Sequence, residues 1–152
     1  MKFLSSQFIA AGLLACVFGA VSAIAETATT PLRVELSGLQ NVEGDLYIAV
    51  YDSDDDWLGD ETVMEKQVVI VESREGELVT TVLELPPGDY ALSIFYDSNS
   101  NGELDTNFIG IPKEPVAISN NARPKFGPPK YKDAVFTLGE EPLTQSISME
   151  KI

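Results

Sequence analysis

The sequence predicts an all-β fold, a single antiparallel β-sandwich of about seven strands, and three observations support this. After Glu26, apolar residues alternate with polar ones or form short solid runs, and no stretch keeps the 3.6-residue period of an amphipathic helix. Gly- and Pro-containing turns separate these segments at regular spacing. Residues 26–152 contain no linker or internal repeat, and this length suffices for one hydrophobic core.

Residues 1–25 have the features of a cleaved export signal. Lys2 precedes an apolar run from Phe8 to Ala25, which ends in the small-x-small sequence Ala23-Ile24-Ala25 that signal peptidase accepts. The run just reaches the length of a transmembrane helix, but it is rich in Ala and Gly and no basic residue follows it closely. We therefore expect an exported protein, periplasmic or secreted, with no transmembrane segment in the mature chain.

Cys16 raises an alternative to a cleaved signal. Residues 13–16 (LLAC) resemble a lipoprotein box, which would place a lipid on Cys16. A lipoprotein normally turns polar directly after this cysteine, whereas residues 17–25 are almost all apolar or small. A lipid anchor on Cys16 is therefore the minor alternative.

The first three predicted strands differ in their patterns. Residues 32–36 alternate between apolar and polar, and Gly38 ends this segment. Residues 46–51 (LYIAVY) are apolar on both faces, which predicts a central strand covered on each side. Residues 68–71 form a short β-branched run, and residues 73–76 are the expected turn after it.

The next two predicted strands, residues 79–85 and 90–96, each place apolar side chains on one face. Between them, Pro87 and Gly88 occupy the second and third positions of a four-residue turn. This pattern fits type II, which needs a positive φ at Gly88, so we expect a hairpin. Two short strands, residues 134–138 and 145–149, are expected to complete the fold.

The composition excludes several kinds of active site. The chain has no histidine, and its one cysteine lies in the predicted signal. A Ser-His-Asp triad, a cysteine nucleophile and a zinc site of imidazole and thiolate ligands are therefore excluded from the mature chain. Without Lys2, 9 basic and 24 acidic residues leave a net charge of −15. This charge disfavours nucleic acid and anionic membrane surfaces, and favours a cation or a basic partner protein.

Residues 97–133 form a long irregular stretch, and such stretches in compact domains are usually functional or ligand-stabilised. The stretch begins with the D-x-N-x-N-G spacing of an EF-hand-type calcium loop. Calcium takes about six to eight oxygen ligands, which alternate side chains of a tight loop supply. The predicted ligands are the side chains of Asp97, Asn99, Asn101 and Asp105 and the backbone carbonyl of Glu103, with Gly102 at the turn.

This calcium pattern is incomplete. The twelfth position, where a bidentate Glu belongs, is Phe108, and no helical pattern flanks the loop. A last ligand must come from Asn107, Glu114 or another loop. Asp, Asn and Gly are also ordinary turn residues, so a loop held by its own hydrogen bonds is the alternative to calcium as a cofactor.

Two further charged clusters are candidates for binding. Residues 52–56 (DSDDD) precede Trp57, and we expect a solvated loop in which Trp57 covers the rim of a core rather than stacking on a ligand. The second cluster is basic, and it either binds a small anion or pairs with the acidic loops. Two asparagines beside it, Asn120 and Asn121, either contact a ligand or satisfy backbone groups. The basic residues are Lys113, Arg123, Lys125, Lys130 and Lys132, and the candidate binding residues are Asn120, Asn121, Arg123 and Lys125.

These motifs together resemble a bacterial family called domain of unknown function 2141. The resemblance extends from about Leu32 to Ile152, and it implies an exported, single-domain protein without an established activity. The family usually has Gly and an aromatic residue before the Ser-Asn-Asn triplet, where this chain has Ala117 and Ile118. The segments that carry the resemblance are 97–114, 119–123, 126–128 and 133–136.

A second, shorter resemblance concerns the fold alone. Residues 85–90 (LPPGDY) are similar to the hairpin of prealbumin-like and carboxypeptidase-regulatory-like sandwiches. The sandwich is accordingly expected to be prealbumin-like or immunoglobulin-like. Similarity of fold does not transfer a function.

Three hypotheses about function follow. The leading one is an exported, non-enzymatic binding or structural module of the bacterial envelope, with calcium ordering residues 97–114. The second is a carboxylate- or metal-dependent hydrolase, although no spacing isolates an acid–base pair among the many carboxylates. The third is a carrier that grips a small anion or a partner with residues 52–62 and 113–132. The sequence does not indicate an oligomeric state.

Overall fold

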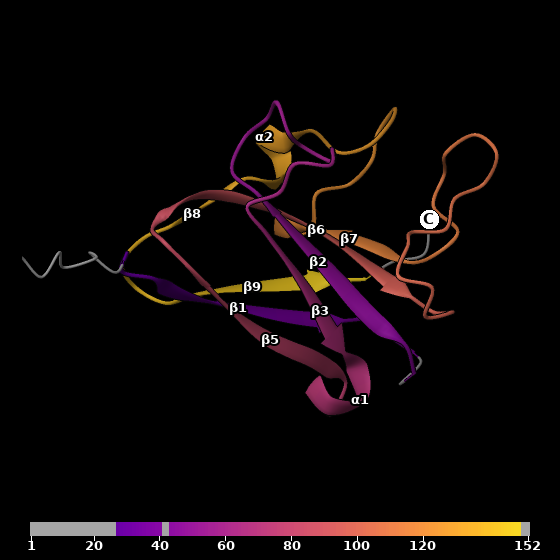
Figure 1. Ribbon diagram of the computed structural model, residues 1–152, viewed down its shortest axis with the longest axis horizontal. Helices are drawn as coiled ribbons and strands as arrows, with labels where there is room; N and C mark the ends of the chain where they lie inside the picture. Colours follow the sequence, from indigo (N-terminus) through magenta and orange to yellow (C-terminus); the bar gives the residue numbers. More distant parts are fainter. Residues whose placement is uncertain (1–26, 41–42, 150–152) are drawn as a thin grey trace, which may run out of the picture.

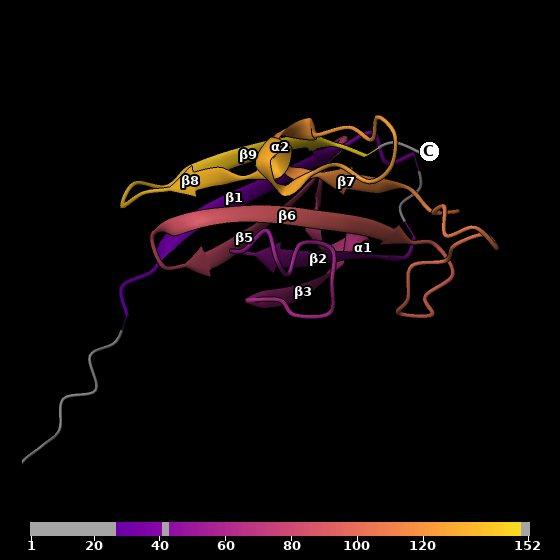
Figure 2. The same cartoon turned by 90° about the horizontal axis from the view of Figure 1, so that it is seen from above.

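The computed structural model describes residues 27–40 and 43–149, which form two sheets packed face to face (Figures 1 and 2). One sheet has the order β4-β5-β1-β9, and the other has the order β3-β2-β6-β7, with β8 also paired to β6. The predicted all-β sandwich is therefore confirmed. The strands are β1 (Thr30–Ser37), β2 (Asp45–Tyr51), β3 (Met64–Val69), β4 (Arg74–Glu75), β5 (Leu78–Leu85), β6 (Gly88–Asp97), β7 (Val116–Ile118), β8 (Phe136–Leu138) and β9 (Leu143–Ser148). The helical segments are α1 (Ile70–Ser73), η1 (Ser119–Asn121) and α2 (Tyr131–Ala134).

The predicted export signal and Cys16 lie outside the described residues. Among the residues that are described, no helix is long and apolar enough to cross a membrane.

The core lies between the two sheets and follows from the alternation of the strands. In β1, every second side chain is buried, and the same alternation brings one face of β2 and of β6 inward. Apolar burial of this kind contributes about 25 cal/mol per Å². The fully buried inward residues include Leu32, Val34, Leu46, Ile48, Leu92 and Ile94.

The outer side of β2 differs from the prediction. β2 is central in its sheet, between β3 and β6, as expected. Of its outward side chains, Tyr47 and Ala49 are only half-buried, whereas Tyr51 at the end of the strand is buried beside Trp57. Tyr47 stacks on Phe95 of β6 instead, with ring centroids 5.0 Å apart.

The predicted hairpin between residues 79–85 and 90–96 is wrong. β5 pairs with β1 and β4, whereas β6 pairs with β2 in the opposite sheet, so the connection crosses from one sheet to the other. Gly88 does not take the positive φ that a type II turn needs. A Cβ on Gly88 would lie 3.2 Å from the ring of Tyr90, so a larger residue here would require the ring to shift. Tyr90 closes the crossing by donating from its hydroxyl to the carbonyl of Pro86 at 3.0 Å.

The chain also crosses between the sheets at α1, where a continuing strand was expected. β3 ends at Val69, and the single helical turn of α1 buries Ile70 while Val71 remains 72% exposed. β4 then pairs with β5 around a turn at Gly76, whose φ is +66°. Alternation in the sequence indicates which side chains are buried, but not which sheet receives them.

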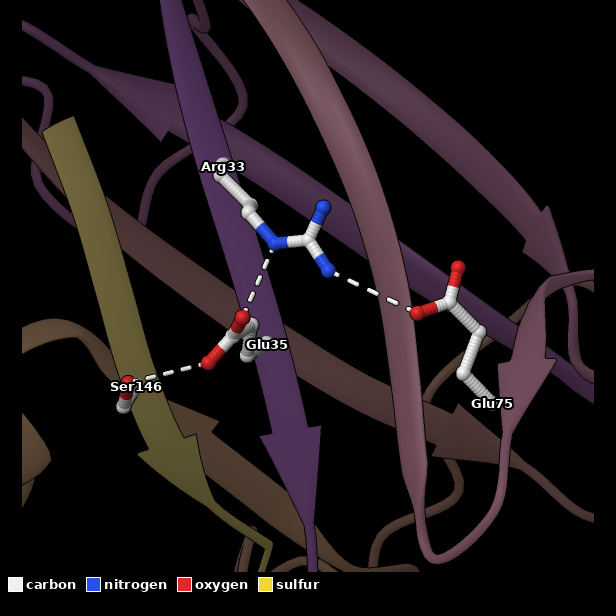
Figure 3. A network of polar contacts seen from close by, with 4 residues as sticks. All are labelled: Arg33, Glu35, Glu75 and Ser146. Carbon is white, nitrogen blue, oxygen red and sulfur yellow. Dashed lines mark hydrogen bonds and ion pairs between the residues drawn. The ribbon is translucent and has the colours of Figure 1, made fainter. Parts of the chain in front are cut away.

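The sheet that contains β1 has one parallel pair of strands, and a polar network lies on its outer face. β9 pairs with β1 in parallel, from Leu32 opposite Leu143 to Ser37 opposite Ser148, whereas the other strand pairs are antiparallel. On the outer face of this sheet, a polar network joins neighbouring strands (Figure 3). The network consists of Arg33 bonded to Glu35 at 2.8 Å and to Glu75 at 3.5 Å, and of Ser146 bonded to Glu35 at 3.3 Å.

The edge of β6 opposite β2 is occupied by two short strands in succession. β7 pairs with residues 93–95 and β8 with residues 88–90, both antiparallel, and Figure 2 shows them on the same side of β6. Residues 119–135 leave the sheet between β7 and β8 and return to it. We call this segment the excursion, and residues 97–114, which connect β6 to β7, the acidic loop.

Candidate functional site

Asp97 organises the acidic loop. It is the last residue of β6, it has no exposed surface, and its carboxylate accepts three backbone N–H bonds. One oxygen accepts from Asn99 at 3.3 Å and Asn101 at 3.2 Å, and the other accepts from Gly102 at 2.7 Å. A buried carboxylate needs such partners, because an unpaired one would lose several kcal/mol of solvation. The positive φ of Gly102, +79°, lets the chain close around it.

Asp105 brings the side chains of the loop together. Its carboxylate accepts from the amide of Asn99 at 2.7 Å and from the amide of Asn101 at 3.5 Å. Of the five predicted calcium ligands, the four side chains at positions 97, 99, 101 and 105 therefore lie around one turn. The side chain of Glu103 is exposed, and its backbone N–H donates to Asn101 at 2.8 Å.

Glu114 supplies a further carboxylate from outside the turn. It is only 4% exposed, and it accepts from the backbone N–H and the hydroxyl of Ser98 at 2.8 and 3.0 Å, and from the N–H of Asp105 at 3.2 Å. Of the two named residues proposed to complete the site, Glu114 reaches the turn formed by residues 97–105. The side-chain oxygen of Asn107 instead accepts from Ile109 and Ile111 in a separate turn.

In the described residues, no ion pair involves the carboxylates of the acidic loop. The ion pairs found there join Arg33 to Glu35 and Glu75, and Lys132 to Asp133, so none reaches Asp97, Asp105 or Glu114. Partial burial, followed by the charges of Asp45 and Asp97, raises the pKa of Tyr47 beside the loop.

The loop does not form a metal centre made of carboxylates alone. Within residues 27–40 and 43–149, no group of three or more His, Cys, Asp or Glu is placed to hold an ion. A calcium site here requires the amide oxygens of Asn99 and Asn101, which would turn toward the ion and release the N–H bonds to Asp105.

The excursion is held by uncharged side chains. Ser119 is fully buried in the gap between β7 and β8, where its hydroxyl accepts from the N–H of Leu92 at 2.9 Å and donates to the carbonyl of Ala134 at 2.7 Å. It thereby replaces the backbone partner that an uninterrupted strand would supply. This role of Ser119 was not predicted, because a serine between two short strands carries no distinctive sequence pattern.

Asn120 and Asn121, two of the predicted binding residues, use their amides inside the protein. Asn120 donates to the carbonyls of Ala134 at 3.1 Å and Val135 at 2.8 Å. Asn121 pairs with the free edge of β9 as a backbone unit would, donating to the carbonyl of Ser146 at 3.1 Å and accepting from the N–H of Ser148 at 2.8 Å. Both asparagines have a positive φ, 57° and 52°, which Asn tolerates better than most residues. In this structure the two side chains satisfy backbone groups.

Arg123 and Lys125, the other two predicted binding residues, lie on a cavity of about 480 Å³ in the excursion. Asn121 does not line it. Lys132 makes an ion pair with Asp133 at 3.8 Å, and Lys125 and Lys130 make none with a described residue. Four of the residues that line the cavity are basic and one is acidic. Its lining residues are Arg123, Lys125, Phe126, Pro128, Pro129, Lys130, Lys132 and Asp133.

Trp57 connects the acidic tract at residues 52–56 to the excursion. Its indole N–H donates to the carbonyl of Pro129 at 2.8 Å, and its ring meets Tyr51 and Tyr131 edge-to-face at 5.2 and 5.8 Å. Trp57 and Tyr131 pack with Ala91, Ile118 and other residues in a small apolar cluster on the outer face of the sheet. Trp57 thus packs at the rim of a core in this structure.

Comparison with family models matches residues 34–146 to a family described as an uncharacterized protein conserved in bacteria, DUF2141. The chain belongs to the DUF2141 family. The resemblance predicted from the sequence is thereby confirmed. No curated protein and no solved structure matched the chain. The similarity to prealbumin-like sandwiches therefore stays a prediction.

The family match includes both the acidic loop and the excursion. The two positions before Ser119, where DUF2141 sequences usually carry Gly and an aromatic residue, have structural roles here. Ala117 is in the main core, and Ile118 is 8% exposed in the outer cluster with Trp57. The apolar residue at position 118 is explained by this packing, and no contact with a ligand is needed to explain it.

Proposed function

We propose that this member of DUF2141 is an exported, non-enzymatic β-sandwich module of the bacterial envelope, and that calcium orders its acidic loop. The observation that carries the proposal is the gathering of four oxygen-bearing side chains, Asp97, Asn99, Asn101 and Asp105, around one turn, where neither carboxylate makes an ion pair with a described residue. Glu114 adds a buried carboxylate at the base of the loop.

Calcium would act on the loop rather than on the whole fold. Sites in extracellular modules have dissociation constants of about 0.1–1 mM. With about 1 mM calcium and a dissociation constant of about 0.1 mM, binding to the folded state adds about 1.4 kcal/mol of stability. This amount is sufficient to shift the conformation of one loop.

The contacts of the carboxylates support a non-enzymatic role. A glycoside hydrolase needs two carboxylates that face each other across a pocket, one as acid and one as base or nucleophile. The two most buried carboxylates, Asp97 and Glu114, instead each accept three hydrogen bonds within the loop. The cavity in the excursion includes Asp133 among several basic residues.

The test is the melting temperature of EDTA-stripped protein with and without 1 mM calcium, repeated with magnesium. We expect calcium to raise the melting temperature by roughly 5 °C. Asp105→Asn removes a proposed ligand charge, and Glu103→Gln removes an exposed charge two residues away as the matched control. Loss of the calcium effect in Asp105→Asn alone supports the site. No calcium effect in the wild type, or an equal effect in Asp105→Asn, contradicts it.

A second candidate function is carriage of a small anion, because the basic cavity of about 480 Å³ lies on the surface of the excursion. Titration with inorganic phosphate tests it directly. Saturable binding that Lys125→Gln weakens would support the carrier, and no binding at millimolar phosphate would dismiss it.

A further inference from the structure

Two surfaces of opposite charge lie side by side at one end of the sandwich. Trp57, which follows the acidic tract at residues 52–56, donates to the carbonyl of Pro129 at 2.8 Å, and its ring meets that of Tyr131. Pro129 and Lys130 line the basic cavity of the excursion. The acidic tract therefore adjoins the basic residues of the excursion, and Figure 1 shows the loop after β2 beside α2.

The two surfaces do not neutralise each other within the chain. In the part of the chain that the structure describes, Lys132 pairs with the adjacent Asp133 at 3.8 Å, and Lys125 and Lys130 form no ion pair. The carboxylates of the acidic tract form no ion pair with a described residue either. Both sets of charges are therefore available to a partner. The exposed charged residues of the two surfaces include Asp52, Asp54, Asp55, Lys125, Lys130 and Lys132.

Each surface also exposes an apolar side chain. Phe126 is fully exposed on the excursion, and Leu58, directly after Trp57, is 39% exposed. These side chains matter because exposed ion pairs add little to affinity, whereas buried aromatic side chains dominate the energetics of protein interfaces. Pro124 and Pro128 restrict the backbone around Phe126, which reduces the entropy lost when a partner fixes this segment. Apolar side chains surrounded by charged ones are the usual composition of a protein–protein interface.

We propose that two copies of this chain bind each other at this end, with the acidic tract of each copy against the excursion lysines of the other. A two-fold axis between neighbouring patches of opposite charge sets each patch against its complement, so the surface matches a second copy of itself. A partner of a single charge sign would match one patch and be repelled by the other. In the dimer, Phe126 and Leu58 are covered by the opposite copy.

The net charge of the chain, −14, does not prevent this contact. At a salt concentration of about 0.15 M, charges separated by more than about 8 Å are largely screened. Repulsion between the two copies is therefore weak compared with the attraction between adjacent opposite charges. The proposal goes beyond the calcium-ordered module and the anion carrier, and it depends on neither.

The first test is sedimentation equilibrium of the exported, purified protein in EDTA. At about 0.15 M salt we expect a reversible dimer with a dissociation constant of roughly 1 μM, weakened roughly tenfold at about 1 M salt. The tract variant Asp54→Lys/Asp55→Lys and the excursion variant Lys125→Glu/Lys130→Glu should each weaken the dimer roughly a hundredfold, because like charges then face each other. Glu140→Lys/Glu141→Lys makes the same change of charge as the tract variant in the exposed turn between β8 and β9, and it should dimerise as the wild type does.

The second test mixes the tract variant and the excursion variant in equal amounts. In the mixed dimer, the unchanged acidic tract faces unchanged lysines at one contact, and the introduced lysines face the introduced glutamates at the other. We therefore expect the mixture to dimerise with roughly the affinity of the wild type, which a misfolded variant would not do. Phe126→Ser should weaken the dimer roughly tenfold, whereas Val71→Ser, at a 72% exposed position on α1, should leave it unchanged.

Three results would overturn the proposal. They are a wild type that stays monomeric at about 0.1 mM, a dimer that the charge-reversed variants retain, and a mixture of these variants that stays monomeric. Because the measurements are made in EDTA, any of these results would leave the calcium proposal untouched.

Discussion

The acidic loop and the excursion are neighbours in the sequence, yet opposite means hold them in place. The acidic loop closes around Asp97 and Glu114, two buried carboxylates that accept backbone N–H bonds. The excursion is held by the neutral side chains of Ser119, Asn120 and Asn121, which bond to β6, to residues 134–135 and to β9.

On the calcium proposal, this difference separates a segment that responds to a cation from one that does not. The carboxylates of the acidic loop make no ion pair with a described residue, so a bound cation or a change of charge would act on the loop directly. The amides and the hydroxyl under the excursion carry no charge. The excursion therefore serves as a fixed base for its basic cavity.

The largest effect on stability is expected when the charge of Asp97 in the acidic loop is removed. Asp97→Asn keeps the shape, but in either orientation its NH₂ group faces N–H donors of Asn99, Asn101 or Gly102. We expect a loss of about 2–3 kcal/mol in the free energy of unfolding, measured with urea. Glu103→Gln in the same loop should change it by less than about 0.5 kcal/mol. Equal stabilities of the two variants would refute the organising role of Asp97.

In the excursion, the corresponding experiment introduces a charge by replacing an amide with a carboxylate. Asn121→Asp keeps the acceptor for Ser148, but places a carboxylate oxygen against the carbonyl of Ser146, to which the amide now donates at 3.1 Å. We expect a loss of about 1–2 kcal/mol in urea unfolding, smaller than for Asp97 because Asn121 is exposed. An unchanged midpoint would mean that Asn121 does not hold the excursion to β9.

The smallest effect is expected from alkaline pH, and it reports on the packing beneath the excursion. Burial, followed by the charges of Asp52 and Asp89, raises the pKa of Tyr131, and burial likewise raises that of Tyr51. A phenol whose pKa is higher in the folded state contributes stability below its unfolded pKa of about 10 and loses it as the pH rises further. The free energy of unfolding should therefore fall above about pH 10, and less steeply in Tyr131→Phe. An identical slope in the variant would contradict this assignment.

The sequence predicted the buried faces of the strands better than their partners. The alternation in residues 32–36 and 90–96 identified inward side chains correctly, because burial acts on each residue separately. It did not show that residues 85–90 cross between the sheets, or that β9 pairs in parallel with β1, because pairing depends on the whole topology.

The same limit applies to the loops. The spacing from Asp97 to Asp105 correctly indicated side chains that gather around one turn, since those contacts are local. The gap between β7 and β8 was not predicted, because each strand has only three residues and Ser119 fills the gap through a contact with Leu92, distant in the sequence.

The most direct test of the central claim is a calcium titration followed by ¹H–¹⁵N NMR of the EDTA-stripped protein. We predict that the backbone signals of Asn99, Asn101 and Gly102 and the side-chain amide signals of Asn99 and Asn101 shift and saturate at about millimolar calcium. The side-chain amides of Asn120 and Asn121 should keep their positions, because their partners are backbone groups. A spectrum in which the acidic loop does not respond, or in which the excursion responds instead, would contradict the account.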